Sequence, residues 1–129
     1  MVAPILPEII RQHAEQAAFL WTVYDRAMLF PEENPEMDKV RIDRLLERLE
    51  AHLDGLRVAG AEGLAIAEDR LKEYHEAGEL FVVRMLQPGA AGVRVVDLDL
   101  GKVREYLGEV LPHKIPPDHK SIKDAAQDM

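Results

Sequence analysis

A stripe of leucine and isoleucine residues between residues 38 and 60 constrains the fold more than any other feature of this sequence. Its members are Ile42, Leu45, Leu46, Leu49, Leu53 and Leu56. Side chains three and four residues apart are neighbours on a helix surface, so this spacing predicts one apolar helix face. The opposite side carries Arg41, Asp43, Arg44, Glu47, Arg48, Glu50, Asp54 and Arg57. We therefore expect a helix whose leucine face packs on the rest of the chain or on a partner.

Proline and glycine residues mark the ends of further helices. Pro7 suits the first turn of a helix that runs to about residue 30, where Pro31 ends it. The second half of this helix is apolar nearly all round, which indicates neighbours on more than one side. Its alanines at 14, 17 and 18 would allow one neighbour to approach closely.

The second and third helices follow the same logic. Either Asn34, before Pro35, or Asp38 caps the second helix, and Gly60 ends it. A third helix is expected over 61–77, ended by Gly78.

Residues 79–100 permit two interpretations. The apolar run over 80–86 suits a buried helix or a strand, and the alternation over 96–100 would suit a half-buried strand after a turn at 87–92. We favour a helix over 79–87 and keep a β-hairpin over about 80–100 as the alternative. A last helix is expected over 100–111 with Asp99 as its cap, and 112–129 is expected to be an extended or mobile tail. The fold class predicted is thus mainly α, built from antiparallel helical hairpins, in one domain over 1–111.

Composition excludes several classes of function. The chain has 129 residues, enough for one domain with its own core, and it has no cysteine, which excludes disulfides and thiolate chemistry. Its formal net charge of -8 argues against nucleic acid and anionic lipid as ligands, because both require a basic surface. No apolar run is long enough to span a bilayer and no basic leader opens the chain, so we expect a cytoplasmic protein that contacts no membrane.

The third helix carries the candidate binding surface. Glu62, Asp69, Glu73 and Glu76 lie opposite its apolar side, and we expect Glu79 to extend this acidic stripe. Such a surface would speed the encounter with a basic protein partner. His52 and His75 fall on apolar helix sides, where we interpret them as core histidines rather than metal ligands.

Three strings of the sequence resemble one family of proteins. They are IIRQHAEQAAFLW at 9–21, LEAHLDGLRVAG at 49–60 and EAGELF at 76–81. The chain resembles a family of uncharacterised proteobacterial proteins, of which it would be a short member. The resemblance implies stacked HEAT-like antiparallel helix pairs, a scaffold that binds other proteins, and for some members a place near genes of type VI secretion and its toxins.

Two functional hypotheses from different classes follow. The first is a non-catalytic protein-binding module, a small immunity or adaptor protein that occludes a toxin or effector, with no cofactor and no metal. It is favoured because the only serine and threonine are Ser121 and Thr22, which leaves almost no candidate nucleophile. The alternative is a small metal-dependent enzyme that uses Asp97, Asp99 and either His113 or His119.

Overall fold

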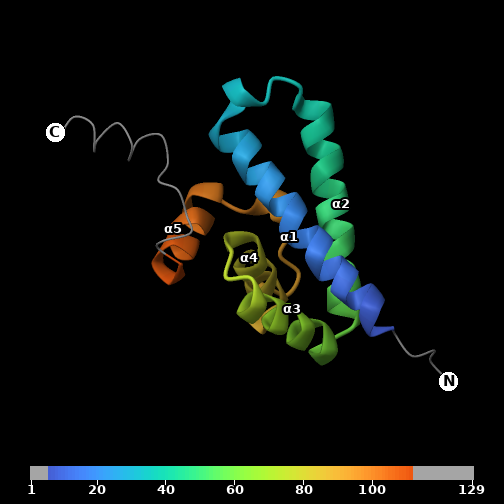
Figure 1. The fold of residues 1–129 in the computed structure, drawn as a ribbon. Coiled ribbons are helices and arrows are strands. Elements are labelled where there is room, and N and C mark those ends of the chain that lie inside the picture. The colour runs from blue at the N-terminus through green and yellow to red at the C-terminus, as the bar shows by residue number, and fades with distance from the viewer. Residues whose placement is uncertain (1–5, 112–129) are drawn as a thin grey trace.

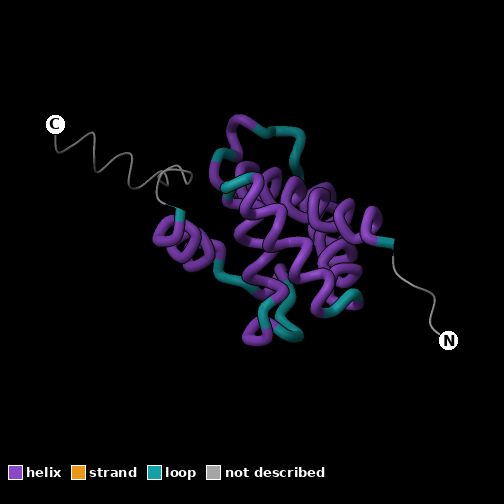
Figure 2. Tube along the Cα trace, turned by 60° about the horizontal axis from the view of Figure 1, so that its bottom comes forward, coloured by secondary structure: helices purple, strands orange, loops and turns teal. Residues whose placement is uncertain are grey.

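A computed structural model describes residues 6–111, which form five α-helices and three short 3-10 helices (Figure 1). The helices are α1 Pro7–Leu29, α2 Lys39–Val58, α3 Ala61–Glu73, α4 Ala77–Leu86 and α5 Leu100–Val110, with 3-10 helices at Pro31–Glu33, Pro88–Ala90 and Val95–Asp97. None of the described residues forms a strand, as Figure 2 shows. The mainly α prediction is confirmed and the β-hairpin alternative is wrong.

The alternating segment fails to form a strand because turns interrupt it at both sides. Gly92 has a positive φ of 78°, and the 3-10 turn that follows buries Val95 while its neighbour Val96 is exposed. Asp99 then accepts a hydrogen bond from the Lys102 backbone N–H and caps α5, as predicted.

Helices α1 and α2 lie side by side and antiparallel, joined at one end by residues 30–38 (Figure 1). The predicted leucine face is the centre of the core, with Leu49, Leu53 and Leu56 fully buried. Asp38, rather than Asn34, caps α2, because its carboxylate accepts the Arg41 backbone N–H at 2.9 Å. Gly60, with φ 63°, lies between α2 and α3 where a left-handed residue was expected.

Helix α4 crosses α1 at very short range. A Cβ atom on Gly78 would lie 2.5 Å from the carbonyl oxygen of Ala18, so only glycine fits there. Next to this crossing, Trp21 and Phe81 stack with ring centroids 5.0 Å apart. The small residues predicted to admit a neighbour therefore do so, and α4 is that neighbour.

The prediction for the end of the third helix was wrong. Helix α3 ends at Glu73, and Gly78 lies in the first turn of α4 rather than after the end of α3. The close contact with α1 requires glycine at this position, so Gly78 serves helix packing and does not end a helix.

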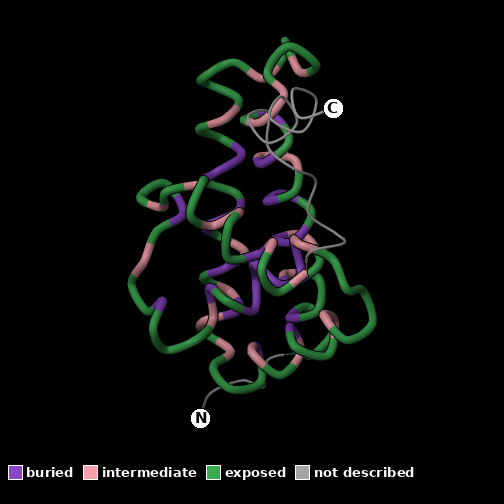
Figure 3. The backbone as a smooth tube through the Cα atoms, turned by 90° about the vertical axis from the view of Figure 1, so that its left-hand side faces the viewer, coloured by how far each residue is buried: buried purple, intermediate pink, exposed green. Residues whose placement is uncertain are grey.

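Most of the buried apolar side chains form one cluster that draws on all five helices. Figure 3 shows the buried segments gathered in the middle of the molecule. Helix α5 joins through Leu107, which is fully buried, and through an ion pair between Arg104 and Asp25 of α1. Over residues 6–111, no helix combines the length and apolarity needed to cross a membrane. The predicted tail at 112–129 lies outside the described residues.

Candidate functional site

The solvent side of α3 and the turn after it form an acidic face, which we define as Glu62, Asp69, Glu73 and Glu76. All four side chains are exposed. The other side of α3 packs inward, with Ala67 buried and Leu64 and Leu71 half-buried against the core. The helix therefore presents one apolar and one acidic side, as its sequence predicts.

Glu79 does not belong to this face. It is buried on α4, and its Oε2 accepts a hydrogen bond from Arg70 Nε at 3.1 Å. Burial raises the pKa of Glu79, and the Arg70 guanidinium partly offsets the rise. The prediction of an exposed Glu79 fails because α4 begins a new direction after residue 76, which turns this carboxylate toward α3.

Basic groups also lie closer to the acidic face than the sequence of α3 indicates. A hollow of about 370 Å³ separates α1 from α3, and it is lined by Arg11, Glu15, Ile66, Asp69, Arg70, Glu73 and Tyr74. Arg11 of α1 and Arg70 of α3 thus lie beside Asp69 and Glu73 of the acidic face. Glu62 and Glu76 lie outside its lining.

The two histidines expected in the core behave differently. His75 is exposed in the turn after α3, so its prediction as a core residue is wrong. His52 is half-buried and its Nδ1 lies 3.0 Å from Nδ1 of His13 on α1. The His13 ring lies over Gly55, where a Cβ would come within 2.8 Å of it. Burial, then His13, then Arg48 lower the pKa of His52.

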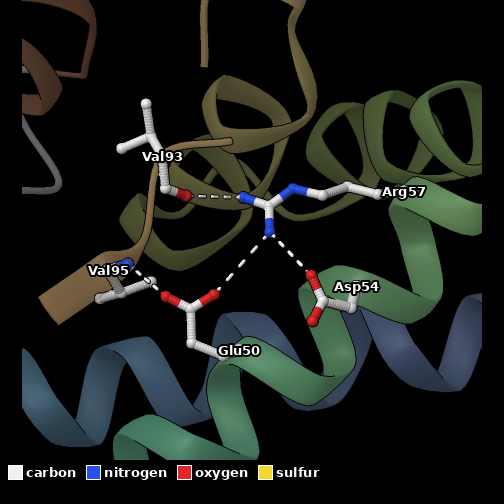
Figure 4. Close-up of polar contacts among 5 residues, drawn as sticks. All are labelled: Glu50, Asp54, Arg57, Val93 and Val95. Atoms are coloured by element: carbon white, nitrogen blue, oxygen red, sulfur yellow. Dashed lines mark hydrogen bonds and ion pairs between the residues drawn. The ribbon is translucent and has the colours of Figure 1, made fainter. Parts of the chain in front are cut away.

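A polar cluster beneath the loop after α4 holds two charges predicted to be solvated (Figure 4). Glu50 is buried and accepts a hydrogen bond from the Val95 backbone N–H. Arg57 Nη1 lies 3.1 Å from Asp54 Oδ1 and 3.8 Å from Glu50 Oε2, while its Nη2 donates to the Val93 carbonyl at 3.2 Å. These contacts fasten the 93–95 segment to α2, so the role of the cluster is structural.

The residues of the alternative enzyme hypothesis are only partly described. Asp99 serves as the α5 cap and Asp97 is exposed in the preceding 3-10 helix. His113, His119 and Ser121 lie outside the described residues. Within 6–111, no group of three or more histidine and acidic side chains is placed to hold a metal ion. The Thr22 hydroxyl donates to the Ala18 carbonyl at 2.9 Å.

A search of protein-family models found no match to this chain, and searches of curated proteins and of solved structures found none either. The resemblance to a family with HEAT-like repeats therefore stays a prediction.

One feature of the molecule was not identified as a site from the sequence. Asp25 interrupts the apolar stretch of the first helix, and in the structure it is 9% exposed at the edge of a second hollow, between α1 and α4. A lone carboxylate inside an apolar helical stretch is the signal that could have indicated it, because such a charge needs a partner.

Proposed function

We propose that this protein is a non-catalytic binding module whose acidic face holds a basic protein partner. More specifically, we propose a small cytoplasmic immunity or adaptor protein that covers the active or binding surface of a toxin or effector. The observation that carries the proposal is the exposure of Glu62, Asp69, Glu73 and Glu76 on the solvent side of α3 and the turn after it.

Charge supports this choice of partner. Over residues 61–76, one positively charged side chain, Lys72, is exposed, whereas five acidic side chains are exposed: Glu62, Glu68, Asp69, Glu73 and Glu76. A concentration of one sign attracts an oppositely charged surface and repels acidic ones, so it acts on the encounter rate and on the choice of partner. The whole chain, with its net charge of -8, adds to this attraction.

The family resemblance supports the finer part of the proposal. It implies a HEAT-like helical scaffold used for protein binding and, for some members, proximity to genes of type VI secretion. The scarcity of serine and threonine and the lack of cysteine agree with a function that requires no nucleophile.

The test begins with the partner that copurifies with the full chain. In a variant with Glu62, Asp69, Glu73 and Glu76 replaced by Gln or Asn, the association rate at low salt should fall at least about tenfold, and its salt dependence should weaken. The matched control neutralises four exposed acidic residues on other elements, namely Glu36, Glu47, Asp97 and Glu105.

The control separates the acidic face from net charge. Both variants change the net charge equally, so a loss confined to the first variant locates the interface on α3. An equal loss in both would assign the effect to net charge and refute the proposed face. An unchanged rate in the first variant would refute it as well.

A further inference from the structure

A second hollow, of about 370 Å³, lies between the C-terminal half of α1 and the start of α4. Its apolar lining comes from Ala18, Phe19, Trp21, Leu29, Phe30 and Ala77. Carboxylates of Asp25, Glu76 and Glu79 also line it, together with Arg26. This volume is at the low end of the about 300–1,000 Å³ found for ligand sites, which suits one extended side chain rather than a large cofactor.

Asp25 is the main polar feature of this hollow. Its Oδ2 accepts a hydrogen bond from Arg104 of α5, whereas its buried Oδ1 has no hydrogen-bond partner among the described residues. Burial raises the pKa of Asp25, and Arg104 only partly offsets the rise. A carboxylate with one unsatisfied oxygen is stabilised by a further donor, above all by a charged one.

Glu79 adds a second, mostly buried carboxylate to the same hollow. Arg70 donates a hydrogen bond to its Oε2, a backbone hydrogen bond also supports the carboxylate, and the side chain is 10% exposed. Three carboxylates and one cation, Arg26, line the hollow, so the lining disfavours an anion and gains little from a neutral apolar ligand. The carboxylates favour a ligand that carries a positive charge at one end.

The aromatic lining suits the rest of such a ligand. Phe19 is 60% exposed, and Trp21 and Phe30 contribute further ring surface. Aromatic rings attract cations and also cover the methylene stem of a lysine or arginine side chain. Arg26 already lies over the Phe30 ring, 5.6 Å from its centroid, and near Glu33 at 3.9 Å. The protein's own cation, Arg26, thus lies on the Phe30 side of the hollow.

We propose that the hollow between α1 and α4 binds an organic cation, an alkylammonium or guanidinium group, and that this cation is a lysine or arginine side chain of the basic partner. The identification with a partner side chain rests on the proposed function, whereas the cation site itself does not. Glu76 belongs both to the acidic face and to the lining of the hollow, so one partner surface can reach both.

Trp21 provides a direct assay, because it is the only tryptophan and it lines the hollow. Its fluorescence is followed while the full chain is titrated with n-butylammonium chloride at constant ionic strength, and with n-butanol as the uncharged counterpart. We expect a saturable fluorescence change with butylammonium. Butanol should bind at least about tenfold more weakly, because it cannot form the charge-assisted hydrogen bond.

Variants assign the binding to the carboxylates. Asp25→Asn and Glu79→Gln should each weaken butylammonium binding at least about tenfold, whereas the exposed Asp97→Asn should not change it. Circular dichroism confirms folding, and Glu79→Gln decides the question if Asp25→Asn does not fold. Equal binding of butanol, no saturable change, or full binding in both folded variants would each overturn the site.

Binding measurements with the copurified partner separate this inference from the proposed function. With the copurified partner, Asp25→Asn should mainly raise the dissociation rate, because the hollow acts after encounter. If butylammonium binding is lost in that variant while the partner dissociates unchanged, the cation site stands and its assignment to a partner side chain is refuted. A triple variant Glu62→Gln, Asp69→Asn and Glu73→Gln leaves the hollow intact, so an unchanged association rate there refutes the acidic face alone.

Discussion

Replacement of Arg57 by methionine tests how the buried carboxylate of Glu50 is stabilised. Methionine keeps much of the apolar stem of arginine and removes its charge and its donors. The lost contacts are an exposed pair with Asp54, a hydrogen bond to the Val93 carbonyl and the pair with Glu50, at 3.1, 3.2 and 3.8 Å respectively. They differ in burial, so they should differ in their contributions to stability.

The contact with Asp54 contributes least, because that side chain is 67% exposed and exposed pairs give about 0.2–1 kcal/mol. The hydrogen bond to Val93 should contribute about 1.5 kcal/mol, the low end for a charged donor, because the Arg57 side chain is partly exposed. The pair with Glu50 matters most, because that carboxylate is 8% exposed and an orphaned buried charge costs about 3–5 kcal/mol. The long 3.8 Å separation and the Val95 N–H that Glu50 keeps both reduce this figure. We expect Arg57→Met to lower the free energy of unfolding by about 2–4 kcal/mol.

Urea denaturation of a small set of variants provides the measurement. Asp54→Asn should cost less than about 1 kcal/mol. Glu50→Gln keeps an acceptor for the Val95 N–H and removes the charge, so it should cost less than Arg57→Met. The double variant Glu50→Gln, Arg57→Met should lose less stability than the sum of the two single losses, because it leaves no buried charge without a partner. The reasoning is refuted if Arg57→Met costs no more than Asp54→Asn, since Glu50 would then be stabilised without its arginine.

Three further predictions concern the packing of the helices. Leu49→Ala should lower the free energy of unfolding by about 2–5 kcal/mol in urea denaturation, because it opens a cavity at a fully buried position; a loss below about 0.5 kcal/mol would contradict the packing of the leucine face. Gly78→Ala should cost about 1–3 kcal/mol, although alanine favours helices, because the added methyl group meets the Ala18 carbonyl; a gain in the urea midpoint would disprove the close crossing. The lowered pKa of His52 means that the unfolded chain binds this proton more readily, so the stability it contributes is present above the ordinary pKa of about 6.5 and is lost as pH falls below it. From about pH 7.5 to about pH 5.5, the urea midpoint of the native chain should therefore fall by more than that of His52→Gln, and equal falls would show that His52 is not the source.

Sequence patterns predicted the helices well where a local signal is sufficient. Pro7 and Asp99 act within one turn of the helix ends that they define, so their roles can be predicted without the fold. Gly60 is similar, since its φ is a property of one residue. At the start of α2 the sequence leaves Asn34 and Asp38 as alternative caps, and the structure selects Asp38. The periodicity of α2 identified a buried face, although it could not indicate that α1 covers it.

The failures share a different cause, which is a partner distant in the sequence. Gly78 was interpreted as a helix end because its close neighbour, Ala18 of α1, lies 60 positions away. Glu79 was expected on the surface because nothing near it in the sequence indicates the pair with Arg70 across the turn. His52 was correctly placed near the core, but its pairing with His13 depends on the antiparallel alignment of α1 with α2.

Three ion pairs with little exposure show how the fold uses charges that the sequence places on helix surfaces. Asp25–Arg104, Glu50–Arg57 and Arg70–Glu79 each use arginine, whose planar group can donate in several directions and is more weakly hydrated than an ammonium. Two of the pairs join different helices, and Glu50 and Arg57 together hold the 93–95 segment, so each fixes the position of a later part of the chain. Buried pairs of this kind add little net stability, and we infer that they select one arrangement of the helices. Because each pair withdraws one acid and one base from solvent, the net charge of -8 is left to the remaining groups, among which the acidic proportion is higher than in the whole sequence. The internal pairing thus raises the proportion of acidic charge on the surface, and the proposed encounter with a basic partner depends on that charge.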